Sequence, residues 1–205
     1  MNANFIIKEL GVCDYNDTWQ SMKEFTESRT ENTSDEFWCL QHQPVFTLGL
    51  AGRTEHILNT NHTIPIIHCD RGGQVTYHGP GQIIVYILVD LKRANLSIRD
   101  LVTRIEDGVI AYLATLDITA TGNREAPGVY VGNKKIASMG LKVRKGCTYH
   151  GLSFNATMDT TPFNYINVCG YQGLKVTQLQ EYIKISSIIN ISSNLTKFLI
   201  ASIYK

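Results

Sequence analysis

Residues 128–156 read GVYVGNKKIASMGLKVRKGCTYHGLSFNA, and this stretch predicts three consecutive antiparallel strands. Two turn signals divide it, Gly132-Asn133 and Lys145-Gly146, which are typical of short hairpin loops. Side chains alternate along a strand, so a middle strand without a bulge places Lys135 on the apolar face with Ala137 and Met139. An amino group among apolar side chains has its charged form destabilised and can exchange protons near neutral pH. The alternative is that Lys135 sits at the strand end and reaches out to water.

The bulk composition predicts one domain over residues 1–205. With 43% hydrophobic and 18% charged residues, the chain can bury one core and is too short for two. A net charge of +1 argues against a nucleic-acid partner, which usually requires a strongly basic surface. The longest apolar run, Ile83 to Val89, is far shorter than the roughly 20 residues that cross a bilayer, and residues 1–9 do not resemble a secretory signal. Five cysteines without framework spacing indicate reduced thiols, so we expect a cytoplasmic protein with no membrane partner.

On the N-terminal side of this stretch, the patterns predict a helix and several strands. Asp14 can cap a helix that carries an apolar stripe. Residues 37–40 and 45–48 read as the two strands of a hairpin, and residues 64–68 as another strand. Residues 83–90 are rich in Ile and Val, as expected of a buried strand.

Three further helices are predicted from capping signals. Ser97 and Asp100 have the spacing of a capping box, as do Thr177 and Gln180. The last fifteen residues predict a helix capped near Ser193 or Asn194.

The segment Arg71 to Gln82 reads RGGQVTYHGPGQ, with four glycines in twelve residues between two predicted strands. Glycines let backbone amides approach a ligand closely, so we expect ligand contact here, with a flexible surface turn as the alternative. The sequence TYHG at 76–79 recurs at 148–151, which suits two walls of one pocket. The segment lacks the Gly-Lys-Ser/Thr ending of a nucleotide-hydrolase phosphate loop.

Cys169 lies in the short segment Asn167-Val168-Cys169-Gly170-Tyr171, which predicts irregular backbone where a thiol can meet a substrate. We interpret Cys169 as a candidate nucleophile and Lys135 as its proton partner. The alternative is that Cys169 is a small buried apolar side chain, as most single cysteines are.

Two other features bear on ligands and partners. Cys147 and His150 have ligand-like spacing, but no second pair accompanies them, so we expect no metal site. Residues 134–145 carry five basic residues and no acidic one, which indicates a docking surface for an acidic partner or, alternatively, a solvated turn.

Three segments together resemble the lipoyl(octanoyl) transferases, the family that moves octanoyl groups from acyl carrier protein onto lipoyl domains. They are Arg71 to Gln82, Gly128 to Asn155, and Pro162 to Tyr171, in family order. The resemblance implies an α/β fold shared with biotin and lipoate protein ligases, in which helices pack on a mostly antiparallel, mixed central sheet. Val168 stands where this family commonly has proline.

The resemblance also implies roles for individual residues. Cys169 would carry the acyl group as a thioester, and Lys135 would favour its thiolate and shuttle protons. The implied substrate-binding residues are Arg71, Gly72, Gly73, Gln74, Val75, Thr76, Tyr77, His78, Ser138, Met139, Gly140, Gly151, Leu152 and Ser153. No cofactor is implied.

The implied partners are octanoyl-acyl carrier protein as donor, with lipoyl domains of 2-oxoacid dehydrogenase complexes and the glycine cleavage H protein as acceptors. Two other functions remain open at this stage. One is an ATP-dependent ligase of the lipoate or biotin type, which needs no cysteine nucleophile. The other is a non-catalytic module that binds acyl carriers.

Overall fold

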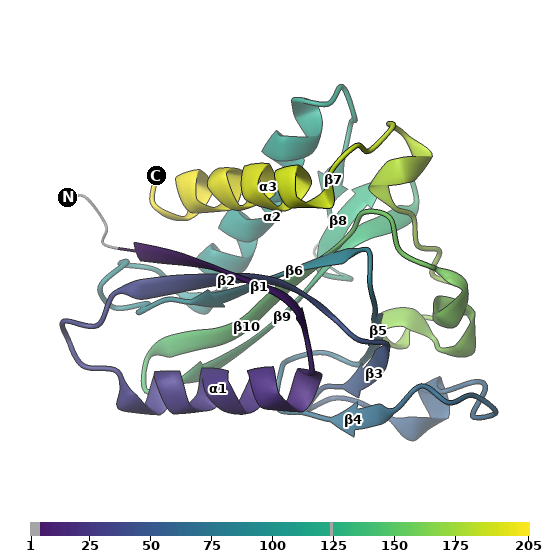
Figure 1. The fold of residues 1–205 in the computed structure, drawn as a ribbon, viewed down its shortest axis with the longest axis horizontal. Helices are drawn as coiled ribbons and strands as arrows, with labels where there is room; N and C mark the ends of the chain where they lie inside the picture. Colours follow the sequence, from purple (N-terminus) through teal and green to yellow (C-terminus); the bar gives the residue numbers. More distant parts are fainter. Residues whose placement is uncertain (1–4, 124) are drawn as a thin grey trace.

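The computed structural model describes residues 5–123 and 125–205, and its main element is a seven-stranded sheet (Figure 1). The strand order is β1-β2-β6-β10-β9-β8-β7, with β1 parallel to β2 and every other pair antiparallel. The strands are β1 (Phe5–Cys13), β2 (Asp35–His42), β6 (Gln82–Leu88), β10 (Cys147–Asn155), β9 (Lys134–Arg144), β8 (Gly128–Val131) and β7 (Thr121–Gly122). The prediction of a mixed, mostly antiparallel central sheet with packed helices is confirmed.

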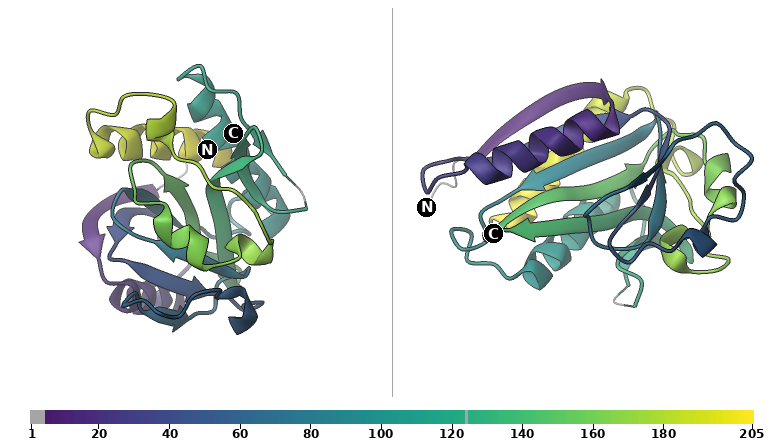
Figure 2. Two further views of the ribbon diagram at one scale, coloured as in Figure 1. Left: turned by 90° about the vertical axis from the view of Figure 1, so that its right-hand side faces the viewer. Right: turned by 90° about the horizontal axis from the view of Figure 1, so that it is seen from below.

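A smaller sheet has the order β4-β3-β5 and lies at one end of the molecule (Figures 1 and 2). Its strands are β3 (Val45–Leu48), β4 (Ile66–His68) and β5 (Val75–His78). It packs against the loops around the 3-10 helices η2 (Thr161–Tyr165) and η3 (Val168–Gly170) through a core that includes Phe46, Tyr77, Phe163 and Val168. The second sheet therefore supports the loop that carries Cys169.

Helices cover both faces of the large sheet (Figures 1 and 2). On one face, α2 (Ile98–Ala114) and α3 (Ile188–Ile203) contribute Leu101, Ile105, Leu195 and Leu199 to the main core. On the other face, α1 (Tyr15–Ser28) buries Met22 against the sheet. In the described part of the chain, no helix has both the length and the apolar character that a membrane crossing requires.

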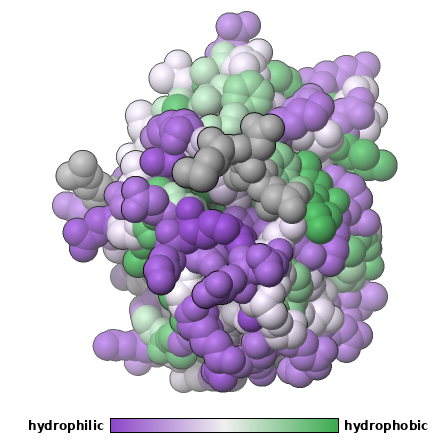
Figure 3. All heavy atoms as spheres, turned by 90° about the vertical axis from the view of Figure 1, so that its left-hand side faces the viewer, coloured by the Kyte–Doolittle hydropathy of each residue, from purple (hydrophilic) through white to green (hydrophobic). Residues whose placement is uncertain are grey.

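The edge strand β1 leaves several apolar side chains accessible, including Ile6, Ile7 and Val12. On the face that looks to the left in Figure 1, apolar surface lies between hydrophilic patches (Figure 3). In the large sheet, the strands β2, β6 and β10 separate this edge from β9.

The three-strand prediction for residues 128–156 is confirmed, with one irregularity. Lys145 and the glycines of both turns have positive φ angles, as short hairpin loops require. However, Ala137 pairs with Val129 and Lys135 with the next residue, Tyr130, so Ile136 is the extra residue of a β-bulge. The alternation was predicted for a strand without a bulge, so it does not apply between Lys135 and Ala137. Ile136 and Ala137 both enter the core beneath the helices.

The hairpin predicted from residues 37–40 and 45–48 is wrong. Both segments form strands, but β2 joins the large sheet beside β6, whereas β3 joins the small sheet beside β5. The glycine-rich segment also contains a strand, β5, where an uninterrupted loop was expected.

Helix starts were predicted correctly in the first half of the chain and less well in the second. Asp14 caps α1 and the Ser97–Asp100 capping box is formed. After Thr177 only the single turn η4 (Leu179–Glu181) forms, because residues 175–177 are extended and pair with β9. The last helix begins earlier than predicted, since its cap is Ser187.

Candidate active site

Cys169 lies in a strained loop between the two sheets. Its backbone is left-handed (φ 54°, ψ 19°), a conformation that residues other than glycine rarely adopt and that often marks functional sites. The loop is held by main-chain hydrogen bonds from Gly170 N to Asn167 O (2.8 Å) and from Asn167 N to His56 O (2.8 Å). Tyr171 Oη donates to the carbonyl of Glu125 (2.5 Å) and so joins the loop to the segment that precedes β8. The half-buried thiol is thus fixed in place.

Lys135 is buried, with 2% of its surface exposed, and its amino group donates to Cys169 Sγ at 3.2 Å. The alternative of a lysine that reaches out to water is therefore wrong. The amino group also lies 5.5 Å from the ring centre of Tyr130, a cation–π distance. If Lys135 is the proton partner of Cys169, the loop 167–171 must meet the start of β9, and the structure brings the two together.

The bulge and an added strand segment explain how Lys135 reaches the thiol. Lys135 N donates to Lys175 O (2.8 Å), and Thr177 N donates to Lys135 O (2.9 Å). The chain that follows Cys169 therefore returns to pair with β9 at the residue that contacts the sulfur. Gly128 gives the side chain room, since a Cβ on this residue would lie 2.2 Å from Lys135 Cε.

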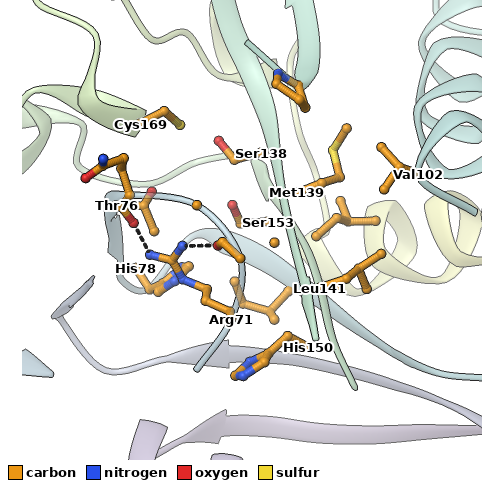
Figure 4. Close-up of a pocket in the computed structure, with 18 of the residues that line it drawn as sticks. Arg71, Thr76, His78, Val102, Ser138, Met139, Leu141, His150, Ser153 and Cys169 are labelled. Carbon is orange, nitrogen blue, oxygen red and sulfur yellow. Dashed lines mark hydrogen bonds between the residues drawn. The ribbon is translucent and has the colours of Figure 1, made fainter. Parts of the chain in front are cut away.

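A cavity of about 430 Å³ opens beside the Cys169–Lys135 pair (Figure 4). Figure 4 shows Ser138 and Ser153 facing the group of Arg71, Thr76 and His78, with Cys169 at one end. Of the predicted substrate-binding residues, the lining includes Arg71, Gly72, Gly73, Gln74, Val75, Thr76, His78, Ser138, Met139, Gly140, Gly151, Leu152 and Ser153.

Tyr77 is placed elsewhere. It packs in the core of the small sheet against Phe46 and Phe163, with ring centroids 5.4 and 5.6 Å away. It points away from the cavity because side chains alternate along β5, where its neighbours Thr76 and His78 do line the cavity.

Several lining residues were missed by the sequence reasoning. They are Tyr15, Ile84, Tyr86, Ile98, Val102, Ala126, Pro127, Leu141, His150 and Tyr171. His150 and Tyr171 belong to segments that had been singled out, so their positions carried a usable signal. Leu141 also lies in a segment that had been singled out, the middle strand of residues 128–156. Ala126 and Pro127 lie in the loop before β8, and the remaining residues come from helices and strands whose apolar patterns are typical of core.

Arg71 shapes the glycine-rich wall. Its buried guanidinium donates to Thr47 Oγ1 and O, to Gln74 O and to Gly72 O, at distances from 2.7 to 3.1 Å. Gly72 N in turn donates to Leu141 O (3.0 Å), which joins this wall to β9. The arginine thus holds its own loop in the shape that lines the cavity.

A second polar cluster surrounds Asp70 and includes His150, which lines the cavity. Its carboxylate accepts hydrogen bonds from Trp19 Nε1 (2.8 Å), from His150 Nε2 (3.0 Å) and from Tyr149 Oη. Burial opposes ionisation of Asp70, but the hydrogen bonds outweigh it and lower the pKa of Asp70 to about 2. Burial also lowers the pKa of His150, so the ring is neutral at neutral pH and donates through Nε2.

The basic segment 134–145 is largely paired within the chain. Lys134 lies 3.4 Å from Glu181, and Arg144 and Lys145 both contact Glu27 of α1. With Lys135 buried beside Cys169, the segment presents less unpaired positive charge than its sequence indicates.

Comparison with known proteins identifies the family. The model of the lipoyl protein ligase A/B catalytic domain matches residues 14–198. The chain belongs to this family. The octanoyltransferase of Chromobacterium violaceum is 56% identical over 175 residues, which cover 85% of this chain and 84% of that protein. The octanoyltransferase of Aliivibrio fischeri is 50% identical over 184 residues, covering 90% of this chain and 81% of that protein.

Solved structures agree with the fold of this family. A bi-partite lipoate protein ligase from Thermoplasma acidophilum superimposes with a TM-score of 0.79 at 14% identity, covering 99% of this chain and 85% of that chain. The biotin protein ligase of Aquifex aeolicus gives a TM-score of 0.58 at 13% identity, covering 98% and 70%. The predicted lipoyl(octanoyl) transferase family, its ligase-like fold and an acyltransferase enzyme are confirmed.

Proposed function

We propose that this acyltransferase moves an octanoyl group from octanoyl-acyl carrier protein to a lysine of a lipoyl domain, through a thioester on Cys169. The observation that carries the proposal is the 3.2 Å contact between the Lys135 amino group and Cys169 Sγ beside the cavity. A thiol with a buried amine as its proton partner is the arrangement that acyl transfer between a thioester and an amine requires.

In the first half-reaction, Cys169 Sγ attacks the carbonyl carbon of the donor thioester. The thiol proton passes to the Lys135 amine, the carrier sulfur leaves, and Lys135 returns the proton to it. A new thioester on Cys169 replaces the one broken on the carrier. Because the two thioesters are chemically alike, this step needs no ATP.

In the second half-reaction, the amine of the target lysine attacks the Cys169 thioester. An amide forms, Cys169 Sγ leaves as a thiolate, and the proton lost by the amine returns to the Cys169–Lys135 pair. Gly170 N and Gly72 N are already hydrogen-bonded within the protein, so they are poor candidates for stabilising the oxyanion. We assign that role to Lys135 in its ammonium form, a charged donor beside the reacting sulfur.

The cavity is suited to the acyl chain. Its volume of about 430 Å³ lies in the range of small-molecule sites, and apolar side chains such as Ile84, Val102, Leu141 and Leu152 line it. The polar atoms of Ser138, Ser153 and Thr76 lie nearer the thiol (Figure 4).

The partners follow from the same chemistry. High-identity relatives are named octanoyltransferases, and one structural neighbour is described together with its E2 lipoyl domain, which supports lipoyl domains as acceptors. An acidic acyl carrier protein as donor, the H protein as a further acceptor and a cytoplasmic location remain predictions.

Intact-mass measurement after mixing the protein with octanoyl-acyl carrier protein tests the proposal, in the absence of nucleotide. We expect a single octanoyl adduct that maps to Cys169 and is discharged by a lipoyl domain. The Cys169→Ser variant should retain no thioester adduct, and Cys39→Ser is a matched control in the buried core. If Cys169→Ala instead modifies lipoyl domains fully with ATP and free octanoate, the protein is a ligase. If no adduct forms and the carrier only binds, it is a binding module.

A further inference from the structure

Glu106 of α2 lies close to the Cys169–Lys135 pair, with Gly128 between Glu106 and Lys135. Its Oε1 accepts a hydrogen bond from Gly128 N at 2.9 Å. The carboxylate also lies against Gly122, where a Cβ would be 3.1 Å from Oε2. Glu106 thus lies against the two short strands β7 and β8.

Gly128 links Glu106 to Lys135. A Cβ on Gly128 would lie 2.2 Å from Lys135 Cε and 3.0 Å from Lys135 Nζ, so the glycine backbone is in direct contact with the lysine side chain. The contacts therefore run without a gap from the Glu106 carboxylate through Gly128 to Lys135, and from Lys135 to Cys169.

Within the described residues, charged and titratable groups near the pair come from the Cys169 loop, from β8, from α2 and from His56. Cys169 and the ring of Tyr130 contact Lys135, and His56 and Tyr171 lie beside the loop that carries Cys169. Burial raises the pKa of Tyr130 to about 12, so this phenol stays neutral. Asp107, next to Glu106, is half-exposed and pairs with Lys205 at 3.2 Å. Burial raises the pKa of Glu106, while the Gly128 hydrogen bond and the positive charge of Lys135 act in the opposite direction.

We propose that Glu106 is a positioning residue for Lys135, which fixes Gly128 against the lysine side chain and supplies a negative charge that favours the ammonium form. This inference rests on the Cys169–Lys135 pair of the proposed function. It adds a third residue to the machinery that moves the proton, and this residue comes from a part of α2 that does not line the cavity.

The negative charge of Glu106 changes the proton affinity of the Cys169–Lys135 pair in one direction. A negative charge near a group of titratable side chains disfavours the loss of a proton from any of them. Removing the charge at Glu106 therefore shifts the proton losses of the coupled Cys169–Lys135 pair toward lower pH. A purely structural carboxylate has no such effect when an isosteric amide replaces it.

Glu106→Gln keeps an oxygen that can accept from Gly128 N and removes only the charge. The rate of Cys169 alkylation by iodoacetamide, mapped by peptide mass, is followed against pH. We expect the midpoint of the profile to move about one pH unit lower, the size typical of a nearby charge that is partly shielded by solvent. Asp107→Asn removes the same charge one residue further along α2 and should leave the profile in place.

Glu106→Ala removes both the charge and the hydrogen bond. We expect it to slow formation of the octanoyl adduct about tenfold or more relative to Glu106→Gln, because Gly128 and Lys135 lose their support. Thermal unfolding of each variant confirms that the comparison is made on folded protein.

Two outcomes overturn the inference. One is a Glu106→Gln profile that coincides with that of Asp107→Asn. The other is a shift that persists in full when Lys135 is replaced by Met, because Glu106 would then act on Cys169 directly. The alkylation assay needs no acyl donor, so a missing octanoyl adduct counts against the proposed function and leaves this test intact.

Discussion

Gly128→Ala should disable the enzyme although neither Cys169 nor Lys135 is replaced. The new Cβ would lie 2.2 Å from Lys135 Cε, whereas ordinary contacts begin near 3.4 Å, so the lysine must move by 3.4 − 2.2 = 1.2 Å. The methyl group would also lie 2.7 Å from Ala137 O, which is backbone of the bulged strand and cannot yield. A displacement of this size at Lys135 Cε moves the amino group out of the position in which it contacts Cys169 Sγ at 3.2 Å.

Loss of a positioned base typically costs about 10²- to 10⁴-fold in rate, so we expect a fall of at least about 100-fold in octanoyl adduct formation. Overpacking should also lower the free energy of unfolding by roughly 1–3 kcal/mol. The rate is measured by quenched intact-mass spectrometry and the stability by urea unfolding. Adduct formation should recover partly at high pH, where hydroxide replaces the base.

Gly11→Ala is the matched control. Gly11 also has a positive φ angle, but it lies on β1 with open space around it, so the variant costs roughly 1 kcal/mol in backbone strain and leaves the site alone. We expect it to acylate Cys169 at the parent rate. If Gly128→Ala acylates as fast as Gly11→Ala, the role given to the Lys135 position is refuted.

Three further outcomes are expected. Thr47→Val removes a hydroxyl that accepts hydrogen bonds from two nitrogens of the buried Arg71 guanidinium. The free energy of unfolding, measured in urea, should fall by about 1–3 kcal/mol. The KM for the donor should rise, because Arg71 holds the glycine-rich wall of the cavity. Burial lowers the pKa of His42 to about 4, below its value in the unfolded chain, so its contribution is full above pH 6.5 and is lost as the pH falls toward 4. The parent should therefore lose about 3 kcal/mol more than His42→Gln over that interval, measured by urea unfolding at each pH. Glu27→Gln removes the carboxylate that pairs with Arg144 and Lys145. The association rate with an acidic carrier protein, measured by stopped flow, should therefore rise at low salt, and this increase should vanish at high salt.

The sequence predicted those parts of the fold that local chemistry determines. The Ser97 capping box, the Asp14 cap and the turn glycines of residues 128–156 all depend on neighbours within a few positions, and each was confirmed. The two strands around residue 44 were found, but their pairing was not. Both are buried along most of their length, so their patterns carry no information on which sheet each one joins.

The site itself depended on contacts between distant segments. Cys169 and Lys135 were candidates from their local sequence, and the family resemblance strengthened that interpretation. The bulge at Ile136 that orients the lysine has no signature in the sequence. Thr177 had the spacing of a helix cap, yet its amide pairs with Lys135 O, and this tertiary pairing prevailed over the local preference. The same competition for backbone partners kept the following residues to a single turn.

The pairing of Lys135 with residues 175–177 ties the reactive centre to a local opening equilibrium. The amide of Lys135 donates to Lys175 O and that of Thr177 to Lys135 O, so both protons are shielded only while the segment after Cys169 is docked. Their hydrogen exchange, each corrected for the intrinsic rate of the residue, should give the same opening free energy when this segment detaches as one unit. Solvent exchange at two amides would then measure how often the thiol and its partner separate, in a chain that carries no acyl group at all.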